Sequence, residues 1–174
     1  CQEVGPRMDP SQRRDHAHIA LHTSITGELD RLQLARHRGE VPYPSETVLI
    51  VENEESNRRL MEQILDFAGY RTVTATHGLE ALHMLDQEPV DLVLIDLAMP
   101  VLDGYRATEL IRTRPEYANL PVVAVTAHAM SEDRELALAS GCNEYLAKPF
   151  RPNELLHVVE RMLGHLRALD SSAG

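Results

Sequence analysis

Three side chains with chemically useful groups stand directly after short apolar runs of the sequence: Asp96, Thr126 and Lys148. The run before Asp96, residues 92–95, is bounded by acids on both sides, which is typical of a strand buried on both faces of a parallel sheet. The carboxyl ends of parallel strands lie along one edge of the sheet, where ligands bind. We therefore expect a carboxylate, a hydroxyl and an ammonium to meet at that edge.

A further apolar run, residues 48–51, brings acidic groups to the same edge, because it leads into Glu52, Asn53 and Glu54. Mg²⁺ prefers one or two carboxylates, water and phosphate oxygens to a complete cage of protein ligands. Phosphoryl transfer depends mainly on positioning and on the neutralisation of charge. The residues at this edge therefore predict a pocket for a divalent cation and a phosphoryl group.

Lys148 is the only lysine of the chain, against sixteen arginines. A single lysine among arginines has two interpretations. Either the position needs a compact ammonium, or codon usage favours arginine and this lysine is a chance exception. The first interpretation agrees with a phosphate-binding role for Lys148.

Four segments resemble the motifs of the response-regulator receiver domains of two-component signalling. In chain order they are VLIVENEESNRRL, DLVLIDLAMPVLDG, PVVAVTA and YLAKPF, and the resemblance runs from Thr47 to Leu166. It implies that Asp96 is the phosphoacceptor, that the Thr126 hydroxyl grips the phosphoryl group and that the Lys148 ammonium pairs with it.

The resemblance also implies a switch and a backbone feature beside the site. Tyr145 would be the aromatic residue that reorients on activation, and Pro149 would follow a cis peptide bond. The bound Mg²⁺ would be held by Glu52, Asn53, Asp96 and the backbone carbonyl of Ala98, and no organic cofactor is implied.

The motif departs from the family at Asn53. The family usually places two acids after the first strand, and the second acid, commonly Asp, is a direct metal ligand. The amide oxygen of Asn53 can coordinate Mg²⁺, but one of about three negative charges is lost, which costs on the order of a few kcal/mol before screening. We expect weaker Mg²⁺ binding and slower phosphorylation than an all-acid site would show.

From residue 47 onward the sequence alternates strand and helix patterns with short links, which predicts an α/β, doubly wound, five-stranded parallel sheet of order 2-1-3-4-5, flavodoxin-like. The first helix is expected to bury Leu60, Ile64 and Phe67 and to end at Gly69. Strands are expected near 47–52, 71–76, 91–96, 121–126 and 143–147, and helices near 55–68, 77–87, 105–112, 132–139 and 153–166.

Three regions are expected: residues 1–46 as an N-terminal helical extension and linker, 47–168 as the receiver domain and 169–174 as a disordered tail. A helical stretch within 10–38 carries a narrow apolar stripe, too thin for a core of its own. The stripe must dock on the receiver, on a second copy in a homodimer or on another domain. The histidines of the same stretch lack the further ligands of a metal site. The stripe consists of Leu21, Ile25, Leu29 and Leu32, and the histidines are His16, His18 and His22.

The 174-residue chain carries a net charge of −10, and most of the excess acid lies after residue 46. An acidic domain without a basic face argues against nucleic-acid binding. Two cysteines make no disulfide framework, and no apolar stretch approaches the length of a membrane span. We expect a cytoplasmic protein with no membrane or nucleic-acid partner.

Three functional hypotheses remain open. In the first, a histidine kinase or histidine phosphotransfer protein donates a phosphoryl group to Asp96. The face formed by the fourth helix, fifth strand and fifth helix then changes its affinity for a downstream protein, and the chain is not itself an enzyme. In the second, the chain is a pseudo-receiver that docks partners through a fold with a weakened metal site. In the third, it is a dimeric scaffold that uses residues 10–38.

Overall fold

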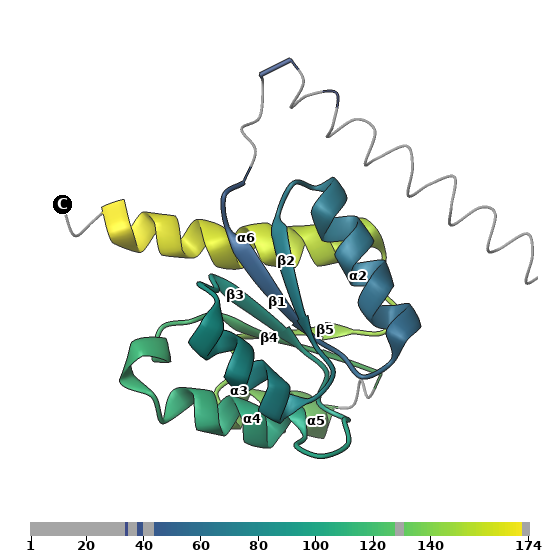
Figure 1. Ribbon diagram of the computed structural model, residues 1–174, viewed down its shortest axis with the longest axis vertical. Helices are drawn as coiled ribbons and strands as arrows, with labels where there is room; N and C mark the ends of the chain where they lie inside the picture. Colours follow the sequence, from purple (N-terminus) through teal and green to yellow (C-terminus); the bar gives the residue numbers. More distant parts are fainter. Residues whose placement is uncertain (1–33, 35–37, 40–43, 128–130, 172–174) are drawn as a thin grey trace, which may run out of the picture. The chain divides into compact units, whose positions relative to one another are not determined.

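The computed structural model describes residues 34, 38–39, 44–127 and 131–171 (Figure 1). The chain divides into two compact units, Cys1–Val41 and Pro42–Gly174. Most of the expected N-terminal helix, its apolar stripe and its three histidines lie outside the described residues, so the scaffold hypothesis remains untested. In the part of the chain that is described, no helix is long and apolar enough to cross a membrane.

The second unit contains the predicted parallel sheet. Its strand order is β2-β1-β3-β4-β5, and every pair of neighbouring strands is parallel. The predicted fold class and strand order are therefore confirmed. The strands are β1 (Thr47–Val51), β2 (Arg71–Ala75), β3 (Leu92–Ile95), β4 (Val122–Thr126) and β5 (Glu144–Ala147).

Helices cover both faces of this sheet. Figure 1 shows α2 and α6 on one face and α3, α4 and α5 on the other, as the right-handed crossovers between parallel strands require. A short 3₁₀ helix, η1 (Pro115–Tyr117), precedes β4 and was not predicted. The helices are α2 (Glu55–Phe67), α3 (Gly78–Gln87), α4 (Gly104–Arg112), α5 (Ser131–Ala139) and α6 (Pro152–Ser171).

The continuous apolar runs of β1 and β3 are explained by burial on both faces. All residues of β1, β3 and β4 are buried, and those of β1 and β3 alternate between the two helical layers. On one side, Leu49, Val93 and Ile95 belong to a core cluster with Ala81 of α3 and Ile111 of α4. Because these central strands are enclosed, the chain leaves the core only at the strand ends.

The predicted burial of the first helix is confirmed for Ile64 but wrong for Leu60. Leu60 is 40% exposed, whereas Met61, Ile64 and Leu65 form the buried face of α2. One residue corresponds to a rotation of about 100° on a helix of 3.6 residues per turn, so a pattern shifted by a single position exposes a leucine. Phe67 is only partly buried.

The predicted start of a disordered tail was also misplaced. Helix α6 continues to Ser171, and therefore includes residues 169–171. No proline interrupts the sequence after Pro152, and Gly164 in the middle of a helix weakens the helix without ending it. Residues 172–174 lie outside the described part of the chain.

Candidate functional site

The ends of four neighbouring strands bring the predicted site residues together. Strand pairing sets Val51 opposite Ile95, so that the next residues, Glu52 and Asp96, emerge side by side. Beyond the end of β5, the backbone N–H of Lys148 donates a 2.8 Å hydrogen bond to the carbonyl of Thr126. The strand ends that carry Asp96, Thr126 and Lys148 therefore meet at the carboxyl edge, as expected.

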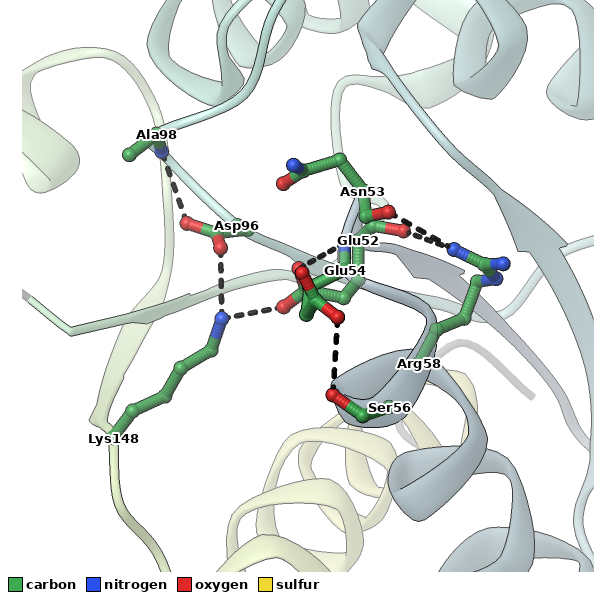
Figure 2. Close-up of polar contacts among 8 residues, drawn as sticks. All are labelled: Glu52, Asn53, Glu54, Ser56, Arg58, Asp96, Ala98 and Lys148. Carbon is green, nitrogen blue, oxygen red and sulfur yellow. Dashed lines mark hydrogen bonds and ion pairs between the residues drawn. The ribbon is translucent and has the colours of Figure 1, made fainter.

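Lys148 lies between the two carboxylates (Figure 2). Its Nζ is 2.7 Å from Oδ2 of Asp96 and makes a second, very short contact with Oε2 of Glu52. Glu52 is fully buried and Asp96 is 8% exposed. Burial works against the ammonium, but the hydrogen bonds and charges of Asp96 and Glu52 outweigh it and raise the pKa of Lys148. The three groups form a buried cluster with one excess negative charge.

The two carboxylate oxygens that do not contact Lys148 accept hydrogen bonds from the backbone. Oε1 of Glu52 accepts from the N–H of Glu54 at 2.9 Å, and Oδ1 of Asp96 accepts from the N–H of Ala98 at 2.9 Å. All four oxygens of the cluster therefore have a protein donor. A phosphoryl group or a cation must replace or share these contacts.

Asn53 stands at the rim of this cluster. Its side chain is exposed, and its amide has no hydrogen-bond partner among the residues described. On the other side of the turn, Nη1 of Arg58 donates a 2.8 Å hydrogen bond to the Glu52 carbonyl and a longer one, at 3.4 Å, to the Asn53 carbonyl (Figure 2). Sequence reasoning missed Arg58, because nothing in Asn57-Arg58-Arg59 shows which arginine faces the turn.

The donor atoms at the cluster suit a weakly held Mg²⁺. Glu52 and Asp96 would supply two carboxylates, the carbonyl of Ala98 and the amide of Asn53 would supply neutral oxygens, and Mg²⁺ accepts such a set together with water. Within the described residues, however, no group of three or more acidic, histidine or cysteine side chains is arranged to hold a metal. The donors fit the ion, but they lack a third charge.

A pocket of about 290 Å³ adjoins the cluster on the side of Thr126, which is 1% exposed at the end of β4. Tyr145 on β5 is partly buried, and burial followed by the charge of Asp133 raises its pKa. Burial and the charge of Asp133 are also the two largest causes that raise the pKa of Tyr105. The pocket therefore places Asp133 and the ring of Tyr105 beside Thr126, the expected switch residue. The sequence did not predict this arrangement. The lining residues are Leu97, Ala98, Asp103, Tyr105, Thr126 and Asp133.

The loop after β3 is drawn tightly against Asp96. A Cβ atom on Gly104 would lie 2.3 Å from the carbonyl oxygen of Asp96, so only glycine allows this approach. Asp103 caps α4 through a 2.8 Å hydrogen bond from the N–H of Arg106. The peptide bond between Lys148 and Pro149 is cis, as expected.

Comparisons with known proteins agree with this geometry. The model of the response regulator receiver domain matches residues 48–160. The polar-differentiation response regulator DivK of Brucella anthropi is 34% identical over 118 residues, which cover 68% of this chain and 96% of that protein. The DivK protein of Brucella ovis is 33% identical over 120 residues, 69% of this chain and 98% of its own.

Solved structures show the same likeness. A putative response regulator from Chloroflexus aurantiacus superposes with a TM-score of 0.67 at 32% identity, over 70% of this chain and 99% of its own. The receiver domain of sensor histidine kinase PA1611 from Pseudomonas aeruginosa gives a TM-score of 0.65 at 37% identity, over 70% of this chain and 99% of its own. That domain has a magnesium ion coordinated in its active site cleft.

Proposed function

We propose, since this chain belongs to the family of response regulator receiver domains, that Asp96 accepts a phosphoryl group from a histidine of a kinase or a phosphotransfer protein. The observation that carries the proposal is the position of Lys148, which bridges Asp96 and Glu52 at the carboxyl edge of the sheet. The chain then acts in the cytoplasm as an acceptor and switch between proteins, without being an enzyme or binding nucleic acid.

The transfer step follows from the contacts of Asp96. An oxygen of Asp96 forms a bond to phosphorus while the bond from phosphorus to the donor's imidazole nitrogen breaks, and that nitrogen keeps the electron pair. The phosphorylated side chain carries more negative charge than the carboxylate did. The Lys148 ammonium, already in contact with Asp96, stabilises that charge, and the Thr126 hydroxyl donates to a phosphoryl oxygen.

Mg²⁺ is the expected helper ion, and it is expected to bind weakly. Glu52, Asp96, the amide of Asn53 and the carbonyl of Ala98 would hold it. When bound, the ion neutralises charge on the phosphoryl oxygens. Because Asn53 is neutral, part of that neutralisation falls to Lys148.

The histidine donor has a suitable docking place beside Lys148. A pocket of about 340 Å³ opens next to the Lys148 side chain, and Leu60 on its rim is 40% exposed. A helix that carries the phosphorylated histidine could rest on this apolar rim and direct its imidazole toward Asp96. The lining residues are Asn57, Leu60, Ala127, Lys148, Pro149 and Phe150.

The downstream partner is expected on the face formed by α5, β5 and α6. Tyr145 belongs to β5, and α5 exposes Leu136 (57%) and Leu138 (44%). Apolar side chains left in water on a short helix are suited to protein contact. Movement of Thr126 toward the phosphoryl group would free space for Tyr145 and so change this face.

A second candidate is an unphosphorylated docking module. The observation in its favour is Asn53, because a receiver that no longer binds Mg²⁺ could keep its fold and its partners while losing the chemistry. Asp96, Thr126 and Lys148 would then serve only as parts of the scaffold. The dimeric scaffold remains a third hypothesis, but the residues that carry it lie mostly outside the described part of the chain.

Phosphorylation by acetyl phosphate with Mg²⁺, measured by intact mass, separates the first two candidates. We expect the protein to gain the mass of one phosphoryl group, and Asp96→Asn to gain none. Asp86→Asn is the matched control, since Asp86 pairs with Arg114 on the surface and should leave the mass gain intact. No gain in the wild type, or a gain that survives Asp96→Asn, contradicts the proposal.

A further inference from the structure

The carbonyl of Glu52 is a buried polar group at the point where β1 leaves the sheet. The N–H of Glu52 still donates to the carbonyl of Ala75 in β2, at 3.0 Å. Its carbonyl accepts the 2.8 Å hydrogen bond from Nη1 of Arg58. Because Glu52 is fully buried, loss of Arg58 would leave this carbonyl without its donor, and a buried carbonyl without a partner is unfavourable.

Both the backbone and the side chain of Arg58 contact the turn 52–54. Its backbone N–H donates to the carbonyl of Glu54 at 3.0 Å, which closes the first turn of α2. Its guanidinium reaches back over the same turn to the carbonyls of Glu52 and Asn53. Glu54, the N-cap residue of α2, makes no capping hydrogen bond with its side chain. The turn 52–54 is therefore held mainly by backbone contacts in which Arg58 takes part.

A chain of side-chain contacts links the turn 52–54 to Asp96, the proposed phosphoacceptor. The carboxylate of Glu52 accepts the N–H of Glu54 and contacts Lys148, and Lys148 contacts Asp96. A shift of the Glu52 backbone therefore moves the lysine that faces Asp96. Figure 2 shows Arg58 approaching the turn from the side opposite to Lys148.

We propose that Arg58 is a positioning residue of the phosphoacceptor site. Its guanidinium holds the turn 52–54 from the side of α2, and it takes the place of a metal contact that the neutral Asn53 would make only weakly. A divalent ion bound by a carboxylate at position 53 would tie the turn from the site side, and a neutral amide offers a weaker bond to the ion. The guanidinium keeps Glu52 and Lys148 in place when Mg²⁺ is scarce. This inference rests on the proposed phosphorylation of Asp96.

Arg59 provides a matched control for Arg58. It is the same residue type at the next position of α2, but it pairs with Glu55 on the surface, where the two side chains are 70% and 62% exposed. Arg59→Ala removes the same charge from the same helix without touching the turn. A difference between Arg58→Ala and Arg59→Ala therefore reports the contact with the turn.

The first test is amide hydrogen exchange at Glu54 in the full chain, without Mg²⁺, because this N–H is bonded to the Glu52 carboxylate. Arg58→Ala should speed exchange about tenfold, whereas Arg59→Ala should change it by less than about twofold. Arg58→Lys, which keeps the charge but loses the planar fork, should fall between them. Exchange in Arg58→Ala that is no faster than in Arg59→Ala overturns the proposal.

The second test is the Mg²⁺ concentration that half-saturates phosphorylation by acetyl phosphate. Arg58→Ala should raise it about tenfold, and the shift should shrink to less than about twofold when Asn53→Asp is added, because the new carboxylate holds the ion by itself. A lower maximal rate with unchanged half-saturation would mean a purely structural role and overturn the proposal. If the wild type takes no phosphoryl group, the proposed function fails, and the exchange at Glu54 still decides the role of Arg58.

Discussion

At the scale of single residues, the site consists of three buried charged groups, the carboxylates of Glu52 and Asp96 and the ammonium of Lys148. Two carboxylates share one ammonium, so that a change at Lys148 alters the contacts of both Glu52 and Asp96. The excess of one negative charge would favour a bound cation, and under the proposed function the Lys148 ammonium would contact the phosphoryl group. Changes to single residues should therefore shift both stability and chemistry.

Lys148 should make the stability of the protein depend on pH in the alkaline range. Its pKa in the folded state is raised above the ordinary value of 10.5. The stabilisation by its contacts is therefore fully present below the ordinary value and is lost as the pH rises through the raised value. Urea unfolding as a function of pH should show this loss in the wild type but not in Lys148→Met, which should already be less stable at neutral pH. An alkaline loss that persists in Lys148→Met would contradict the assignment.

Asn53→Asp should strengthen Mg²⁺ binding. The substitution adds a charge at the exposed rim, where screening reduces the gain to about 1 kcal/mol, which corresponds to about fivefold in affinity. Isothermal titration of Mg²⁺ into the wild type and the variant measures this gain. Asn57→Asp is the control, because it makes the same chemical change on α2, in the pocket beside Lys148 and away from the turn that holds position 53. Equal affinities in the wild type and Asn53→Asp would show that position 53 does not contact the ion.

At the scale of secondary-structure elements, close packing of the loop after β3 positions Asp96. Gly104→Ala would force a Cβ atom against the Asp96 carbonyl, which we expect to cost about 2 to 3 kcal/mol and to slow phosphorylation. Gly164→Ala is the matched control, since an added Cβ in α6 would meet no described atom within 4 Å beyond the backbone of its own helix. That change should stabilise the protein by about 0.5 to 1 kcal/mol. Urea unfolding measures both, and similar effects at the two glycines would refute the packing argument.

Arg112 joins three elements at the other edge of the sheet. It donates hydrogen bonds to the carbonyls of Gly141 and Tyr117 and to the side chain of Asn143, at 2.8 to 2.9 Å. Arg112→Ala should therefore destabilise the fold by about 2 to 4 kcal/mol in urea unfolding. Arg106→Ala, which breaks only a surface pair with Glu109, should stay within about 0.5 kcal/mol. A small effect at Arg112 would mean that water replaces its contacts.

The sequence predicted the elements well because their signals are local. The buried strands β1 and β3 appear as continuous apolar runs, and Gly69, with a φ of +85°, follows the end of α2 where the pattern placed it. The partners of Arg58 and Arg112 could not be predicted, since hydrogen bonds to backbone carbonyls leave no pattern in the chain. Leu60 was misassigned because a helical stripe shifted by one residue remains plausible until the helix is packed.

At the scale of the whole molecule, the apolar core and the candidate site occupy different parts of the sheet. The enclosed strands β1, β3 and β4 supply the apolar core, whereas the carboxyl edge holds two buried carboxylates that share one ammonium and leave one excess negative charge. If Asp96 is phosphorylated as proposed, this division would let the edge change its charge while the sheet beneath it stays intact. It also implies that the functional edge is kept at some expense of global stability.

Asp96→Asn tests that implication, because it leaves Lys148 and Glu52 as a balanced pair and removes the excess negative charge of the cluster. We expect the free energy of unfolding to rise by about 1 kcal/mol in urea unfolding at neutral pH, even though the proposed phosphoacceptor is gone. Asp86→Asn, which removes an equal charge from a surface pair, should change it by less than about 0.5 kcal/mol. If Asp96→Asn lowered stability instead, Asp96 would be part of the scaffold that holds Lys148. The carboxyl edge would then contribute to folding in the same way as the core.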